Sequence, residues 1–424
     1  MLGRTKNWRL RKRGVGSVGV TVLTAFFRSR VDVSALGTES TSQSVDGSLY
    51  LPCDVAFDPE CRTALEQLRP KGDVPMLTED RTPVYVASSG SLEYATLTLA
   101  GYKGGELSEQ INQDRAFIVQ PFFNVGDSFF SGVLDGHGDT GHFVSEFCRK
   151  ELPIQLEAAL NRIDTNNTKA VSDTLIQVVE KVDELIPTDD GLNGGATSTL
   201  VLRLGTTLYF SNTGDSQSVV AGYHRSRGAR ILFATRLDKP DHPEEKARVL
   251  AAGGTVTEAS EDDEARVWHN IDGRSWGLAM SRSLGDHTAT GVIATPVVTA
   301  LDTVQLVEEF IQGAPDQMCA FEVYADGTTH PGTCNDSTDD DERIEAKDVG
   351  LFVVSASDGI LDYVELQAIV DKLGYAFFNA TSTEPYHPLT AAEELIHTAA
   401  KQWHDHHDGQ YRDDIALAAV KLSR

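Results

Sequence analysis

Cysteine is scarce in this sequence, and its spacing fits no metal or disulfide framework. The 5 cysteines among 424 residues form neither the closely spaced pairs of a zinc site nor an even set of bridges. Cys53 and Cys61 are close enough along the chain to form a local disulfide in an exported protein. Free thiols in an intracellular protein are the simpler interpretation.

Basic residues are also few relative to acidic ones. Lysine and arginine together number 37 against 63 aspartates and glutamates, which gives a formal net charge of -26. Because phosphate backbones require basic patches, this balance argues against nucleic acid as a partner. An acidic protein of this kind is better suited to binding cations.

Long hydrophobic runs and internal repeats are missing as well. Residues 14–27 form the one mildly apolar stretch near the N-terminus, and this stretch is too short and too rich in glycine for a membrane span. With 40% hydrophobic residues, the chain can still bury a substantial core. We therefore expect no membrane partner. We also expect a monomer.

The N-terminal region differs in composition from the remainder of the chain. Residues 1–30 contain arginine and lysine but no acid, a pattern typical of a mitochondrial or other organelle transit peptide. A signal peptide, with residues 9–13 as its basic region, fits nearly as well, and a basic tail without targeting function is the third alternative. Residues 31–80 show no clear periodicity. We therefore divide the chain into a basic leader with a loosely structured extension (1–80) and a folded domain (81–424), and expect an intracellular protein.

Apolar patterns in the folded part predict both strands and helices. Apolar residues recur at helical spacing from Phe143 to Leu160 and from Leu175 to Leu185, a hairpin is predicted at 199–210, and a helix begins at Pro243 and stops before Gly253. A last helix is predicted near 390–403, followed by a strand in which Ile415, Leu417 and Ala419 share one face. The order of these elements favours a layered α+β fold.

Two of the apolar runs end in carboxylates. Residues 129–134 run into Asp135 and Gly136, and residues 351–357 run into Asp358 and Gly359. Each run is typical of a buried strand, and the glycine beside each aspartate permits a close approach of backbone. Two such strand ends side by side would provide the oxygen ligands that Mg²⁺ or Mn²⁺ prefers. A metal-activated water would then be available as a reagent.

Several segments, taken in order, resemble the metal-dependent protein phosphatase (PPM) family, the type 2C Ser/Thr phosphatases. The matching segments are Asn112-Gln113-Asp114, Asp135-Gly136-His137-Gly138, residues 195–199 (GATST), Gly214-Asp215-Ser216, residues 278–286 (LAMSRSLGD), residues 357–362 (SDGILD) and Asp413-Asp414-Ile415. The resemblance extends from Tyr102 to Val420. It implies two antiparallel β-sheets packed as a sandwich and flanked by helices, in α-β-β-α layers.

The resemblance also implies a centre of two Mg²⁺ or Mn²⁺ ions, with a weaker third position. Asp135 would bridge two ions, and the Gly136 carbonyl would bind one of them. The other implied metal residues are Asp358 and Asp413 at the second ion, Asp114 acting through metal-bound water, and Asp215 and Asp362 at the third position. His137 would be the general acid that protonates the departing serine or threonine oxygen.

Each of these residues has an alternative interpretation. Asp135 and Asp358 are also ordinary turn residues after strands, and Asp215 is suited to stabilising a tight turn. His137 is also compatible with a buried, hydrogen-bonded histidine. Residues 404–408 (HDHHD) resemble a metal site, but their position predicts a solvated loop after the last helix.

The chain departs from the family pattern at three places. Glu109 stands where many members have a phosphate-binding arginine, and Lys103 or Arg115 are the candidate substitutes. Gln113 stands where an acid is usual, and Asp414 replaces a frequent asparagine.

Acidic runs are prominent at 258–264, within the family's variable flap, and at 339–342. If these runs flank the cleft, they predict a preference for basic phosphopeptides. Otherwise they are solvated loops.

The function predicted from the sequence is hydrolysis of phosphoserine and phosphothreonine in protein substrates by a metal-activated water. A catalytically silent member of the fold that serves as a binding or regulatory module is the alternative. An enzyme acting on a small phosphorylated metabolite is a third possibility, because its metal centre would look the same.

Overall fold

The computed structural model describes residues 85–89, 92–103, 111–123, 126–187, 194–260, 263–271, 274–313, 321–323, 329–331, 344–379 and 386–422. All of them belong to one compact unit, Ser44–Arg424. The predicted leader, the extension up to residue 80, Glu109, the acidic run at 339–342 and every cysteine except the buried, free Cys148 lie outside the described residues.

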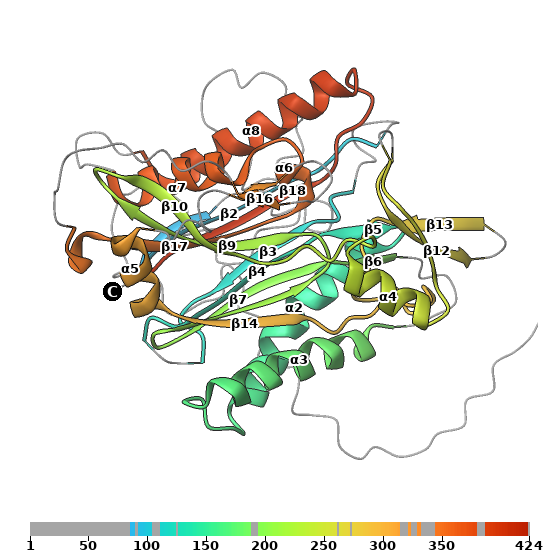
Figure 1. The fold of residues 1–424 in the computed structure, drawn as a ribbon, viewed down its shortest axis with the longest axis horizontal. Coiled ribbons are helices and arrows are strands. Elements are labelled where there is room, and N and C mark those ends of the chain that lie inside the picture. The colour runs from blue at the N-terminus through green and yellow to red at the C-terminus, as the bar shows by residue number, and fades with distance from the viewer. Residues whose placement is uncertain are drawn as a thin grey trace, which may run out of the picture. The chain divides into compact units, whose positions relative to one another are not determined.

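Two antiparallel sheets form the centre of this unit (Figure 1). The 6-stranded sheet has the order β1 (Tyr85–Ser89), β2 (Leu92–Leu99), β18 (Ile415–Lys421), β17 (Gly350–Ala356), β9 (Gln217–His224) and β10 (Gly228–Ala234). The 5-stranded sheet has the order β14 (Val297–Asp302), β8 (Thr207–Thr213), β7 (Ser198–Leu204), β4 (Phe129–Leu134) and β3 (Arg115–Val119). The predicted hairpin at 199–210 is the β7–β8 pair.

Helices cover the outer face of each sheet. Figure 1 shows α7 (Leu366–Asn379) and α8 (Pro388–His406) over the 6-stranded sheet, and α2 (Gly141–Leu160) and α3 (Thr168–Leu185) over the 5-stranded sheet. The short α6 (Asp358–Leu361) follows β17, and α5 (Thr303–Gln312) follows β14. The predicted α-β-β-α sandwich is therefore confirmed. No helix in the described ranges is both long enough and apolar enough to cross a membrane.

The pair β5–β6 and the flap lie at one end of the sandwich (Figure 1). Strands β5 (Gly136–Gly138) and β6 (Gly194–Ala196) pair with each other. The flap, which we define as residues 235–281, contains α4 (Pro243–Ala251) and a 3-stranded sheet of β11 (Thr255–Thr257), β12 (Arg266–Ile271) and β13 (Arg274–Leu278). The remaining elements are a hairpin of β15 (Phe321–Val323) and β16 (Thr329–Pro331), and a 3-10 turn, η3 (Ala346–Asp348).

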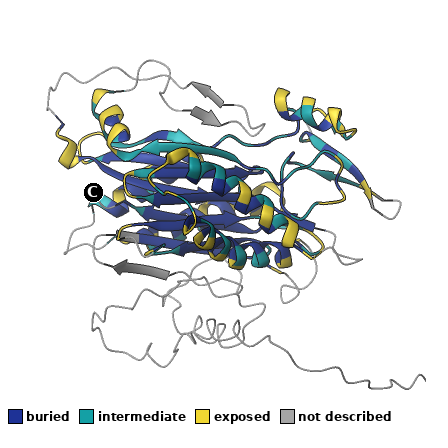
Figure 2. Ribbon diagram, turned by 90° about the horizontal axis from the view of Figure 1, so that it is seen from below, coloured by how far each residue is buried: buried dark blue, intermediate teal, exposed yellow. Residues whose placement is uncertain are grey.

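The central strands are buried on both faces, as the burial colouring in Figure 2 shows. In β18, Ile415, Leu417 and Ala419 belong to the cluster beneath α7 and α8, whereas Ala416 and Val420 belong to the cluster between the sheets. Because successive strand residues point to opposite faces, a strand covered on both sides needs an almost continuous apolar run. This requirement explains why continuous apolar runs in the sequence predict these strands.

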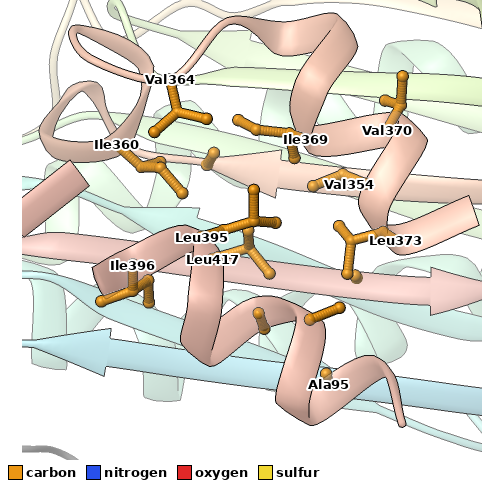
Figure 3. Close-up of a cluster of buried hydrophobic side chains, with 14 of the residues drawn as sticks. Ala95, Val354, Ile360, Val364, Ile369, Val370, Leu373, Leu395, Ile396 and Leu417 are labelled. Carbon is orange, nitrogen blue, oxygen red and sulfur yellow. The ribbon is translucent and has the colours of Figure 1, made fainter. Parts of the chain in front are cut away.

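The helix-side cluster joins the last two long helices to the 6-stranded sheet. In Figure 3, Leu373 of α7 and Leu395 of α8 point toward Leu417 of β18. Ile360 of α6 also belongs to this cluster, so the turn that follows β17 is fixed by the same packing.

Two details of the sequence prediction are wrong. Phe143 does not join the core: it is 53% exposed and lies against His142, while Val144, Cys148 and Leu152 form the buried stripe of α2. The reason is the four-residue spacing of that stripe, which places Phe143 on its outer edge. The predicted loop at 404–408 is helical through His406, so the last helix is longer than expected.

Replacing Leu373 by alanine tests whether the α7 packing stabilises the domain. Leu373 is fully buried, so Leu373→Ala should lower the free energy of unfolding by about 2–5 kcal/mol, since it leaves a cavity. Leu250→Ala on α4 is the matched control, because Leu250 is 50% exposed, and we expect a change within about 0.5 kcal/mol. Urea denaturation followed by circular dichroism measures both, and equal losses would contradict the packing described.

Candidate metal and active site

The antiparallel pairing brings carboxylates from both sheets to one end of the sandwich. Asp135 follows the end of β4, and Asp114 precedes the start of β3, which pairs with β4 through Arg115 and Leu134. In the other sheet, Asp358 follows β17, and Asp413 precedes β18, which pairs with β17 through Ala356 and Leu417. An antiparallel pair places the end of one strand beside the start of its partner, so each sheet presents two aspartates at the same edge.

Two glycines allow the backbone to close tightly at this edge. A Cβ atom on Gly359 would lie 1.9 Å from the Asp414 carbonyl oxygen, and a Cβ on Gly136 would lie 2.5 Å from the Gln113 carbonyl oxygen. No other residue fits at these positions without backbone movement. The Asp-Gly pairs noted in the sequence therefore hold each strand end against the segment that carries the neighbouring aspartate.

Asp135 and Asp358 meet between the two sheets. Burial raises the pKa of both carboxyl groups well above the usual range, and the negative charges of neighbouring aspartates raise it further. Each of the two carboxyl groups acts on the pKa of the other. These residues are thus members of a partly buried cluster of like charges rather than isolated turn residues.

Asp114 is a fully buried carboxylate with unsatisfied oxygens. It is 1% exposed, and neither of its carboxylate oxygens accepts a hydrogen bond of ordinary geometry from the described residues. Burial and the Asp414 charge raise its pKa well above the usual value, and the nearby Ser357 hydroxyl offsets only part of this. Buried carboxylate oxygens without donors fit a divalent cation or its bound water.

The carboxylates do not form a complete cage by themselves. Within the described ranges, no three His, Cys, Asp or Glu side chains are arranged so that they could hold a metal ion alone. An ion at this edge would therefore need backbone oxygens and water in addition to these carboxylates, as Mg²⁺ commonly does.

Asp414 has a structural role that the sequence analysis did not foresee. Its Oδ1 accepts a hydrogen bond of 2.6 Å from the Gly101 backbone nitrogen, and its Oδ2 accepts one of 3.2 Å from the Gln113 backbone nitrogen. It therefore joins the end of β2 and the Asp114 segment to the start of β18. Gln113 donates its side-chain amide to the Gly138 carbonyl oxygen at 2.7 Å.

The two candidate substitutes for a phosphate-binding arginine differ in position. The Lys103 ammonium lies 3.0 Å from Asp413 Oδ1 and 3.4 Å from Asp414 Oδ2. Arg115 is buried and donates to the Asn112 and Asp114 carbonyl oxygens and to Glu146. Lys103 thus lies beside the aspartates at the strand ends, whereas Arg115 holds the backbone of the segment that carries Asp114.

His137 is paired with an aspartate to which the sequence analysis assigned no role. Its Nε2 lies 2.6 Å from Asp286 Oδ2, while its Nδ1 is buried without a partner among the described residues. The Ser283 hydroxyl also donates to Asp286. Burial alone would lower the pKa of His137, but the Asp286 carboxylate outweighs this and raises it. The sequence did contain a signal, because Asp286 ends the LAMSRSLGD segment.

Gly195 makes room for this pair. A Cβ on Gly195 would lie 2.2 Å from the Asp286 carboxylate oxygen. The glycine of the GATST segment therefore allows Asp286 to reach His137.

Asp215 and Asp362 lie on the flap side of the cluster. Asp215 is 1% exposed as a side chain, and Lys239 of the flap donates to its Oδ2 at 2.9 Å. Asp362 keeps a solvent-exposed edge, yet removal of water around its carboxyl group raises its pKa to about 7, against the opposing charge of Lys239. The sequence alone gives no indication of this contact of Lys239.

Comparisons with known proteins agree with this architecture. The family model "Protein phosphatase 2C" matches residues 111–312. "Probable protein phosphatase 2C 34" of Arabidopsis thaliana is 26% identical over 328 residues, covering 73% of this chain and 76% of that protein. "Probable protein phosphatase 2C 73" of the same plant is 27% identical over 365 residues, covering 80% and 81%.

A solved structure shows the same fold. The serine-threonine phosphatase 2C from Toxoplasma gondii superposes with a TM-score of 0.57 at 18% sequence identity, and the match covers 81% of this chain and 98% of that one. The chain is therefore similar to the protein phosphatase 2C family in sequence, and to a solved protein phosphatase 2C in fold. These likenesses support a Ser/Thr phosphatase.

Replacing Asp358 by asparagine tests whether the buried charges repel one another. In metal-free protein, Asp358→Asn should raise the Tm by about 2–4 °C, because it removes one of several like charges. The same variant should lose most of the Tm increase that Mn²⁺ produces in the wild type, since a ligand is missing.

Asp173→Asn is the control for this experiment, because Asp173 is exposed on α3 and pairs only with Lys169. We expect no change in either Tm. Scanning calorimetry with chelator and with Mn²⁺ makes both comparisons, and an Asp358→Asn protein that Mn²⁺ still stabilises fully would place the ion elsewhere.

Proposed function

We propose that this protein phosphatase hydrolyses phosphoserine and phosphothreonine in protein substrates at a centre of two Mg²⁺ or Mn²⁺ ions. The observation that carries the proposal is the gathering of like-charged, buried or partly buried carboxylates at one end of the sandwich, with unsatisfied oxygens on Asp114 and Asp215. The residues that would hold the ions are Asp135 with the Gly136 carbonyl, Asp358 and Asp413, with Asp114 acting through water and Asp215 and Asp362 at a weaker third position.

The ions would supply an activated water and positive charge for the phosphoryl oxygens. The protein's own side chains would act on the leaving group of the reaction. In its protonated form His137 carries a proton on Nδ1, the nitrogen that no described residue engages, and this proton would pass to the departing serine or threonine oxygen. Asp286 fixes the orientation of the ring through the opposite nitrogen.

Lys103 is the candidate for binding the substrate phosphate. It lies at the carboxylate edge beside Asp413 and is 40% exposed. An ammonium group attracts phosphate as a point charge but lacks the two-pronged geometry of arginine.

The alternative of a catalytically silent module is less favoured, because the aspartates and His137 are all present and grouped. A phosphatase for small metabolites would share this metal centre, and the names of the relatives favour the protein phosphatase.

The preference for basic phosphopeptides stays a prediction. Three of the flap acids have basic neighbours: Glu258 pairs with Lys246, Asp263 with Arg266, and Glu264 lies near Lys239. These three would therefore attract a basic substrate less strongly than unpaired carboxylates would.

The direct test is release of phosphate from a phosphothreonine peptide by the full-length protein. We expect turnover with Mn²⁺ or Mg²⁺ and none with chelator. Asp358→Asn should reduce turnover by at least about 100-fold while the protein stays folded, because a ligand charge is removed. Folded wild-type protein that releases no phosphate with either ion would favour the silent module.

A second test separates the role of Asp286 from general damage. Asp286→Asn should lower kcat on a phosphothreonine peptide by about 10–100-fold with little change in KM, because the leaving oxygen needs a well-placed proton donor. Hydrolysis of p-nitrophenyl phosphate should fall much less, since its leaving group needs no proton. Ser283→Ala, which removes the other hydrogen bond to Asp286, should have a smaller effect. Equal losses on both substrates would show that Asp286 acts only on the structure.

A further inference from the structure

Lys239 lies inside the acidic cluster rather than on the surface. Its ammonium is 2.9 Å from Asp215 Oδ2 and 3.8 Å from Glu264 Oε1. The Lys239 side chain is 18% exposed and that of Asp215 is 1% exposed. A salt bridge this deeply buried interacts more strongly than an exposed pair.

Several carboxylates share this one cation. Burial alone would lower the pKa of Lys239, but the charges of Asp215, Glu264 and Asp358 raise it instead. Lys239 in turn acts on Asp362, whose pKa it lowers against the effect of burial. The ammonium thus takes the position of a positive ion among acids from the β8–β9 turn, the flap and the segment after α6.

The flap backbone fixes where Lys239 begins. The Asp238 backbone nitrogen donates to the Gly214 carbonyl oxygen at 3.0 Å, and the Gly214 nitrogen donates to Asp238 Oδ2 at 3.0 Å. Because these bonds join the residues just before Asp215 and Lys239, the lysine stem starts beside its partner. The lysine side chain has a flexible stem of four carbons, so the ammonium group can move away from Asp215 without a movement of the backbone.

The Asp215 carboxylate retains capacity for another cation. Its Oδ1 is buried and has no hydrogen-bond partner among the described residues. A divalent ion that used this oxygen together with Oδ2 would have to replace the lysine at Oδ2, because two cations at one oxygen repel each other.

We propose that Lys239 is a built-in competitor for divalent cations at Asp215, so that an ion binds there only after the lysine side chain has moved aside. The inference rests on the proposed metal centre and concerns only its flap-side position. It explains why an ion at Asp215 and Asp362 would be held more weakly than those at Asp135 and Asp358. It also links occupancy of that position to a residue of the flap.

The test counts Mn²⁺ ions bound to the full-length protein, by equilibrium dialysis and calorimetric titration. Lys239→Gln should bind the weakest Mn²⁺ ion at least about tenfold more tightly than the wild type, because the competing charge is gone. Lys239→Arg keeps the charge and should resemble the wild type. Lys246→Gln is the matched control, because Lys246 is also on the flap and pairs with Glu258 outside the cluster.

Combining Lys239→Gln with Asp215→Asn should abolish the gain, since the contested ligand is removed. Unchanged Mn²⁺ binding in Lys239→Gln would overturn the inference, as would an equal gain in Lys246→Gln. Both results leave the proposed function intact if the wild type still binds two ions and hydrolyses the phosphopeptide. A wild type that binds no Mn²⁺ and releases no phosphate would instead overturn the proposed function together with this inference.

Discussion

Repulsion between buried carboxylates is the constraint on which the site depends. Two unit charges about 4 Å apart interact by about 4 kcal/mol at the effective dielectric of a protein surface, so a cluster of aspartates cannot remain fully charged without compensation. The structure contains two kinds of compensation: raised pKa values, which favour the uncharged forms of Asp135 and Asp358, and lysines at Asp413 and Asp215. A divalent cation is a third kind, and it offers more charge in less space than either.

The fold resists this repulsion through its backbone. Asp414 ties the end of β2 and the Asp114 segment to β18, while the Trp403 indole donates to the Gly359 carbonyl oxygen at 2.7 Å. Because Trp403 belongs to the core beneath α8, helix packing fixes the turn that carries Asp358. The aspartates are therefore held together by the sheets and helices that carry them.

Much of this arrangement could be predicted from the sequence, and the failures have physical causes. Strands buried on both faces leave continuous apolar runs, so the sequence predicts β4 and β17 together with Asp135 and Asp358 at their ends. Asp413 and the other aspartates rest on the family resemblance. The roles of Asp286, Asp414 and Lys239 were not found, because each acts through a partner far away in the sequence: Asp286 through His137, Asp414 through Gly101, and Lys239 through Asp215. Composition and periodicity carry no information about such pairs. The prediction that Phe143 is buried is wrong for a different reason, because apolar spacing alone does not distinguish the edge of a helix's apolar stripe from its centre.

The flap contributes more than a variable surface. The buried Glu245 of α4 accepts hydrogen bonds from Arg236, Arg248 and Arg282 and from the Ser281 hydroxyl. These partners come from the start of the flap, its helix, its last residue and the residue that follows it, so one carboxylate joins both ends. The first end carries Lys239 to Asp215, and the second leads directly into Ser283 and Asp286 beside His137. Movement of the flap base would therefore disturb the Lys239–Asp215 pair and the His137–Asp286 pair together.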